Sequence, residues 1–311
     1  MRGAAARAAG RLLELLDDEQ AAAARHPFAD DAARRWIEYR PQKRPGASLS
    51  GLSEPARKAA HQLLATALRP HAYAQAMAIV ALEEVLDRAE GWRRGRHSED
   101  YWVAVFGEPG DERWGWRFEG HHLSVSMTVD ADEVYPTPVF LGANPATVSY
   151  AGHPVLRPLA LEEEVARALL DALDPAQRGQ AMVAAQAPAD ILSARSPRAA
   201  AIEPLGVPAH RLGPTPRALL DRLVGVYLDR LAPDLARAEA ARLDPGRLHF
   251  AWAGPGEPGH GHYYRVQATD LLIEYDNTQN GANHAHTVLR RPGRDFGGDP
   301  LADHLTGDSG A

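Results

Sequence analysis

The chain has 311 residues, a net charge of −7 and no cysteine. This length suits one large domain or two smaller ones, and it is enough to bury a substantial core. Acidic and basic residues are interspersed, so no basic surface for nucleic acid is expected. The lack of cysteine excludes disulfides, thiolate metal sites and a cysteine nucleophile, and it is compatible with a cytoplasmic protein. No apolar run approaches the roughly 18 residues of a membrane span.

The first ninety residues predict helices. Residues 9–24 form an amphipathic segment, in which Glu14 interrupts the apolar run that a signal peptide would keep continuous. Ser53 is placed as the N-cap of a second helix over 53–68. Residues 71–90 carry apolar side chains at helical spacing and predict a third helix.

Residues 101–148 predict strands. Alternate residues within Trp114–Phe118 are aromatic, whereas the apolar side chains fall on odd positions from Leu123 onward. His121 and His122 lie where the pattern changes phase. A period-2 pattern changes phase only across a bulge or a break between strands, and bulges are common beside functional sites.

Residues 161–187 and 216–243 return to helical patterns, and the proline-rich segment 188–216 separates them. Leu169–Gln177 repeats the pattern of Leu12–Gln20, in which one helix ends and an aspartate begins the next. Internal duplication and shared helix-capping chemistry both explain this similarity.

The last seventy residues predict an antiparallel meander with strands over 247–252, 260–267, 271–276 and 284–290. Two H-x-H pairs lie in it, and they are the most distinctive feature of the chain. Residues i and i+2 of a strand point to the same face, so each pair can aim two imidazoles into one pocket. Imidazole is a common metal ligand and a common acid–base group near neutral pH, so the pairs predict a metal or acid–base site.

We assign candidate roles to the polar residues of these strands because imidazoles and carboxylates hold metals, while guanidinium and amide groups orient polar substrates. The expected ligands of a divalent transition metal, zinc or iron, are His121, His262 and His286. The expected catalytic groups are Glu119, His122, Asp276 and His284. The expected substrate-binding side chains are Arg117, Tyr264, Arg265, Asn277, Gln279 and Asn283.

Each group also has a structural explanation. Strand histidines can be satisfied by hydrogen bonds, and aromatic strand residues pack in cores. Arg117 and Arg265 can form ion pairs with Glu119 and Glu274, and the amide-rich residues near 280 can form a hairpin turn.

The sequence resembles the bacterial and fungal domain-of-unknown-function family 3500. The matching motifs are Pro27-Phe28, Trp36-x-x-Tyr39-x-Pro41, Trp114–Ser124, Phe140–Pro145, His249–Gly254, His262–Arg265, Glu274–His286, Asp295–Gly297 and Asp303-His304. The resemblance extends from about residue 12 to 304 and implies that 1–311 is one family-length unit. It implies no particular function.

The expected fold is α+β, with a largely antiparallel sheet from residues 101–148 and 247–290 packed against helices from 9–90 and 161–243. The first functional hypothesis is a metal-dependent enzyme for a small polar molecule, with hydrolysis preferred over iron or copper redox chemistry. The alternatives are a metal-free lyase or isomerase that uses histidine acid–base catalysis, and a protein that binds a polar ligand unchanged. Neither nucleic acid nor a membrane is an expected partner, and the substrate and oligomeric state stay open.

Overall fold

The computed structural model describes residues 1–93 and 97–298, so Asp303 and His304 lie outside the described residues. The helices are α1 (Arg2–Glu14), α2 (Asp18–Ala24), α3 (Asp31–Arg34), α4 (Glu54–Ala67), α5 (Pro70–Ala89), α6 (Ala160–Ala172), α7 (Pro175–Ala181), α8 (Pro214–Leu228) and α9 (Pro233–Arg242), with short 3-10 helices η1 (Leu49–Gly51), η2 (Ala209–Arg211), η3 (Pro245–Arg247) and η4 (Asp295–Gly297). The strands are β1 (Arg25–His26), β2 (Ala47–Ser48), β3 (Tyr101–Phe106), β4 (Arg113–Gly120), β5 (Leu123–Asp130), β6 (Glu133–Tyr135), β7 (Val139–Ala143), β8 (Val148–Tyr150), β9 (His153–Leu156), β10 (Met182–Ala184), β11 (Val207–Pro208), β12 (His249–Ala253), β13 (Tyr263–Ala268), β14 (Leu271–Gln279) and β15 (His284–Arg290).

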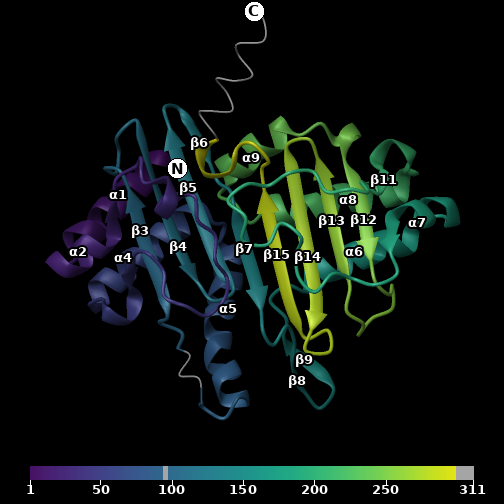
Figure 1. The fold of residues 1–311 in the computed structure, drawn as a ribbon, viewed down its shortest axis with the longest axis horizontal. Helices are drawn as coiled ribbons and strands as arrows, with labels where there is room; N and C mark the ends of the chain where they lie inside the picture. Colours follow the sequence, from purple (N-terminus) through teal and green to yellow (C-terminus); the bar gives the residue numbers. More distant parts are fainter. Residues whose placement is uncertain (94–96, 299–311) are drawn as a thin grey trace, which may run out of the picture.

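One large sheet dominates the described part of the chain (Figure 1). Its order is β1-β3-β4-β5-β7-β15-β14-β13-β12-β10, and β2, β6 and β11 pair at the side of this path. β7 and β15 pair antiparallel at the centre and so join the two predicted sheet segments. The predicted α+β fold with a largely antiparallel sheet is therefore confirmed.

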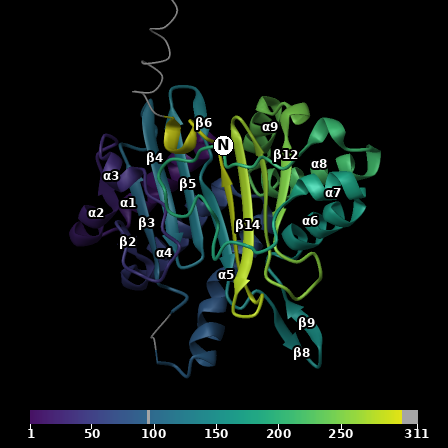
Figure 2. The same ribbon diagram turned by 45° about the vertical axis from the view of Figure 1, so that its right-hand side comes forward.

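Helices cover one face of the sheet and bury the main hydrophobic core against it. This core contains leucines of α4, α6 and α8 together with strand residues such as Trp116, Val125 and Tyr264. Figure 2 shows α6 to α9 grouped beside the strands of the second half, and the β8–β9 hairpin projecting from the end of the sheet where β14 ends. Burial of this apolar surface is the main force that holds the layers together.

Irregular segments cross the opposite face, in front of the sheet in Figure 1. A smaller core lies beneath them, in which Tyr39 stacks on Phe140 and Ile191 packs close by. Tyr39 follows α3, whereas Ile191 follows β10. Segments from both halves of the chain therefore meet over β7 and β15.

Most element predictions hold with shifted boundaries. The predicted helical segment 161–187 is wrong at its end, because Met182–Ala184 form β10, which pairs with β12. The predicted 9–24 helix is two helices, because the side chain of Asp17 caps α2. Ser53 caps α4 as predicted. β13 begins at Tyr263, so both His260 and His262 of the predicted H-x-H pair lie outside the strand.

The two halves of the chain repeat the same order of elements. In each half a helix pair, α1–α2 or α6–α7, leads into a short strand, and a second pair, α4–α5 or α8–α9, precedes a run of antiparallel strands. β1 pairs parallel and β2 antiparallel with β3, and β10 and β11 pair with β12 in the same two ways.

The sequence similarity between the halves marks equivalent points of this repeat. Asp17 and Asp174 cap α2 and α7 through capping boxes that Gln20 and Gln177 complete. The amides of Gln20 and Gln177 then donate to the last carbonyl of η1 and of η2, respectively. Local capping does not require these long-range contacts, so the structure favours internal duplication.

Among the described residues, no helix combines the length and the apolar composition that a bilayer span requires.

Candidate metal centre

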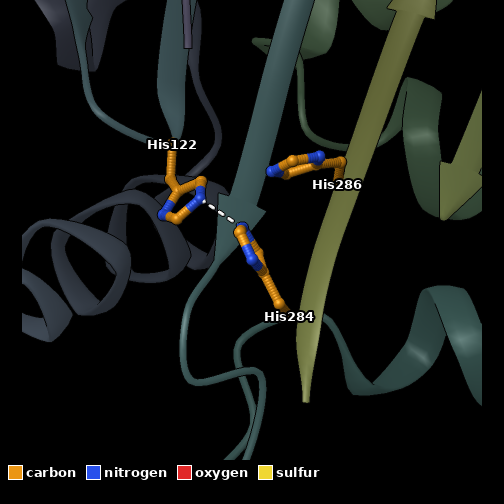
Figure 3. Close-up of side chains that lie close together, drawn as sticks. All are labelled: His122, His284 and His286. Carbon is orange, nitrogen blue, oxygen red and sulfur yellow. Dashed lines mark hydrogen bonds between the residues drawn. The ribbon is translucent and has the colours of Figure 1, made fainter. Parts of the chain in front are cut away.

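Three imidazoles meet where the two halves of the sheet join. His122 lies in the turn between β4 and β5, and His284 and His286 lie on β15. One ring nitrogen from each residue lies within 4.8 Å of the others, and the Nε2 atoms of His122 and His284 are 2.8 Å apart. Figure 3 shows the three rings converging on one space. Two histidines from an H-x-H strand pair and one from a turn therefore form a chelating set.

Local structure explains this convergence. His284 and His286 are two positions apart on β15 and so point to one face. His122 adopts a positive φ of 60°, and its backbone is fixed by hydrogen bonds to Tyr39 and Gly142. A Cβ at Gly142 would lie 2.8 Å from Cδ2 of His122 and 3.1 Å from Cδ2 of His286, so glycine provides the space for both rings.

His286 is oriented by a carboxylate. Its Nδ1 lies 2.8 Å from Oδ1 of Asp190, and the Tyr39 hydroxyl donates to Oδ2 of the same carboxylate. Burial alone would raise the pKa of Asp190, but the hydrogen bond and charge of His286 hold it below its ordinary value. With Nδ1 occupied, Nε2 of His286 is the nitrogen left for a metal, as in the carboxylate–histidine–metal arrangement.

A second carboxylate–imidazole pair supports the cluster from the side of α5. Nδ1 of His121 lies 2.5 Å from Oε1 of Glu83, and both side chains are buried. The His121 ring packs on the His122 ring with centroids 3.6 Å apart. This contact limits the orientations open to His122.

A cavity of about 380 Å³ opens onto the cluster. The four imidazoles, Asp190 and Tyr39 form part of its wall. The rest is polar except for Pro41 and consists of Arg40, Pro41, Glu90, Asn144, Gln279 and Asn280. The cavity has the volume of a small-molecule site, and the imidazoles lie at its wall.

The imidazole spacing suits a metal after a small adjustment. Two nitrogens bound to a tetrahedral zinc ion at about 2.0–2.1 Å lie about 3.3–3.4 Å apart. The Nε2 atoms of His122 and His284 are 2.8 Å apart. The two rings would separate by about half an ångström to admit the ion.

The structure brings together several of the predicted site residues. His122, His284 and His286 form the cluster, His121 packs beside it, and Gln279 reaches the cavity wall. Of the three predicted metal ligands only His286 belongs to the cluster, whereas His122 and His284 were predicted as catalytic groups. Asp276 pairs with His286 across β14 and β15 and lies close to its ring.

His262 and Asn277 lie apart from the cluster. The His262 ring stacks on Trp252 with centroids 4.4 Å apart, on the face that the helices cover. Burial lowers the pKa of His262 to about 4, so the ring is neutral at pH 7. Asn277 accepts a hydrogen bond from the His262 backbone. Asn283 is likewise used internally, because its side chain accepts from the backbone of Thr147.

Glu119 and Arg117 form a buried ion network on another part of the sheet. Arg117 and Arg44 both contact the Glu119 carboxylate, which also accepts from Trp36 and Ser124. The structural explanation therefore fits Arg117 and Glu119 better than a catalytic role does.

Arg265 and Tyr264 are also engaged within the protein. Arg265 donates to the carbonyl of Pro204, and the Tyr264 hydroxyl contacts Tyr227 and the carbonyl of Glu162. Neither lines the cavity.

Four residues of the centre were not among the predicted site residues: Tyr39, Glu83, Gly142 and Asp190. Tyr39 and Gly142 belong to the motifs Trp36-x-x-Tyr39-x-Pro41 and Phe140–Pro145, so a signal was present for them. Glu83 looks like one more charge on a helix, and Asp190 lies in a proline-rich segment without periodicity.

Comparison with known proteins identifies a family. The family model described as protein of unknown function (DUF3500) matches residues 2–298. No curated protein and no solved structure gave a match.

Proposed function

The chain belongs to the DUF3500 family, whose function is unknown, and we propose that it is a metal-dependent enzyme acting on a small polar molecule. The observation that carries the proposal is the convergence of His122, His284 and His286 at the wall of a polar cavity. Three neutral imidazoles are a ligand set for zinc, which leaves one coordination position for water or substrate.

Each part of the centre has a task in this proposal. His122, His284 and His286 would hold the ion, and Asp190 would keep His286 in the orientation that offers Nε2. A zinc ion held by these residues would lower the pKa of its bound water to about 7 and so supply a nucleophile at neutral pH. The preferred reaction is therefore hydrolysis.

Carboxamides on the cavity wall would orient the substrate. Gln279 and Asn280 come from the β14–β15 hairpin, and Asn144 comes from the segment after β7. The Asn280 amide donates to the Asn144 side chain at 3.2 Å, which fixes the two amides relative to each other. Amides offer both donors and acceptors and therefore suit a neutral polar substrate.

A metal-free alternative rests on the two carboxylate–imidazole pairs, Asp190–His286 and Glu83–His121. A carboxylate that fixes an imidazole also serves general acid–base catalysis. In that case the protein would be a lyase or isomerase whose activity survives a chelator.

Metal content separates the two candidates. Tag-free protein is analysed by elemental mass spectrometry beside His284→Ala, His286→Ala and the control His153→Ala, whose side chain is exposed on β9. We expect about one equivalent of a transition metal in the wild type and the control, and at least a tenfold loss in the two cluster variants. A wild type that contains no metal and takes none up on titration would overturn the metal proposal.

A further inference from the structure

Asp276 is a fully buried carboxylate with an unpartnered oxygen. It lies on β14 opposite His286, and its side chain is 0% exposed. Oδ1 accepts a hydrogen bond from the Thr278 backbone at 3.2 Å, but Oδ2 has no hydrogen-bond partner. Leaving a buried polar atom unpaired costs about 1–3 kcal/mol, and more when the group is charged. A proton or a cation beside this oxygen would remove that cost.

A second carboxylate lies close to the Asp276 side chain. Ligand atoms of Asp276, Asp190 and His286 lie within 4.8 Å of one another. Two carboxylates at this distance repel each other unless a positive charge or a shared proton lies between them.

We propose that Asp190 and Asp276 bind a second, hard divalent cation beside the imidazole cluster. Carboxylate oxygens and water are the ligands that magnesium, calcium and manganese prefer, and these ions are commonly held by one or two carboxylates. His286 keeps its hydrogen bond to Asp190 and offers Nε2 to the imidazole site. The inference rests on the proposed function in one respect: Asp190, a ligand of the second cation, is hydrogen-bonded to His286, a ligand of the proposed imidazole site.

This cation would position a segment as well as neutralise charge. Asp190 lies in the segment that crosses the face of the sheet opposite the helices, whereas Asp276 belongs to a central strand. A shared ion would fasten that segment to β14 and so fix the carboxylate that orients His286. The second site would therefore act as a positioning site for the first.

Manganese binding tests the proposal. Mn²⁺ affinity is measured by electron paramagnetic resonance on metal-depleted His284→Ala protein, in which the imidazole site has lost a ligand. We expect one bound equivalent, an affinity at least tenfold lower after Asp276→Asn is added, and no change after Asp132→Asn, whose side chain is fully exposed. Mn²⁺ should also raise the melting temperature of His284→Ala but not that of His284→Ala/Asp276→Asn.

Asparagine matches the shape of a protonated aspartate, so circular dichroism should show a folded double variant. Equal Mn²⁺ affinity with and without Asp276→Asn, or no binding in either protein, would overturn the proposal and leave a shared proton between the carboxylates. This outcome is independent of the transition-metal content of the wild type, which tests the proposed function separately.

Discussion

Nε2 of His122 and Nε2 of His284 lie 2.8 Å apart, although the residues are 162 positions apart in the chain. His122 belongs to the first structural repeat and His284 to the second. The turn between β13 and β14 is equivalent to the turn that holds His121 and His122, but it carries Asp270 in an ion pair with Arg291. The His121-His122 pair therefore has no counterpart in the equivalent turn of the second repeat, as expected for a specialised site on a repeated scaffold.

Gly142→Ala should disturb the cluster without preventing folding. The new Cβ would lie 2.8 Å from Cδ2 of His122, and Gly142 does not have a positive φ, so the backbone accepts alanine. We expect at least tenfold weaker metal binding and a loss of about 1–3 kcal/mol in the free energy of unfolding. Metal titration and urea unfolding measure the two effects. Gly225→Ala in α8, where a Cβ meets no atom within 4 Å, is the control. Unchanged metal affinity in Gly142→Ala would show that the rings are not confined at this point.

Asp190→Asn should weaken metal binding at the proposed imidazole site while leaving its three proposed ligands in place. The Asp190 carboxylate accepts from His286 and from Tyr39, and removing its charge weakens the hold on the imidazole. Loss of such a supporting partner typically costs 10–100-fold in metal affinity. Zinc affinity measured by competition with a chelator gives the value. Tyr39→Phe removes only the hydrogen bond from Tyr39 to Asp190 and should show a smaller loss of affinity. An equal loss in the two variants would contradict the view that the Asp190 charge is the main support of His286.

The β-strand pattern predicted which residues share a face of the sheet, but not which face carries the cavity. His284 and His286 were correctly placed on one side of a strand. His262 directly precedes β13 and continues its alternation. That side, however, carries Tyr264 and Trp252 and packs against the helices. Both faces of the sheet are covered, so the strands carry apolar side chains on both sides. Only the tertiary packing shows which face leads to the cavity.

Contacts made by irregular segments were beyond prediction. Asp190 reaches His286 only because the segment after β10 crosses the sheet, and no periodicity describes such a path. Tyr39 reaches the same carboxylate from the segment after α3. By contrast, the helices and the phase change at His121-His122 were predictable, because each depends on local spacing and capping.

Glu119→Gln should destabilise the protein without changing its metal content. Arg44 and Arg117 contact the Glu119 carboxylate at 3.3 and 3.6 Å, and all three side chains are buried. Removing one charge of a buried network leaves the others uncompensated, which costs about 3–5 kcal/mol. Denaturant unfolding checks this, with the exposed Glu108→Gln as a control expected within about 0.5 kcal/mol of the wild type. Loss of bound metal without a loss of stability would instead indicate that Glu119 contributes to the metal site.

His262 should make the protein less stable in mild acid. Burial lowers its folded-state pKa to about 4, whereas an unfolded histidine titrates near 6.5. The unfolded chain therefore binds the extra proton first. The stability that the neutral ring contributes is fully present above about pH 6.5 and is lost as the pH falls toward 4, by at most about 3 kcal/mol.

Asp276 works in the opposite direction over part of this range, because its folded-state pKa is raised to about 6. In the metal-free protein, folded Asp276 binds a proton at a higher pH than unfolded Asp276 does. The contribution of Asp276 to the free energy of unfolding therefore rises as the pH falls from 6 toward 4. The effect of His262 is therefore isolated by comparing the wild type with His262→Phe, which keeps a ring against Trp252. Between pH 7 and pH 4.5, urea unfolding should show a greater loss of stability for the wild type than for His262→Phe. Equal losses would mean that His262 is not held neutral by its surroundings.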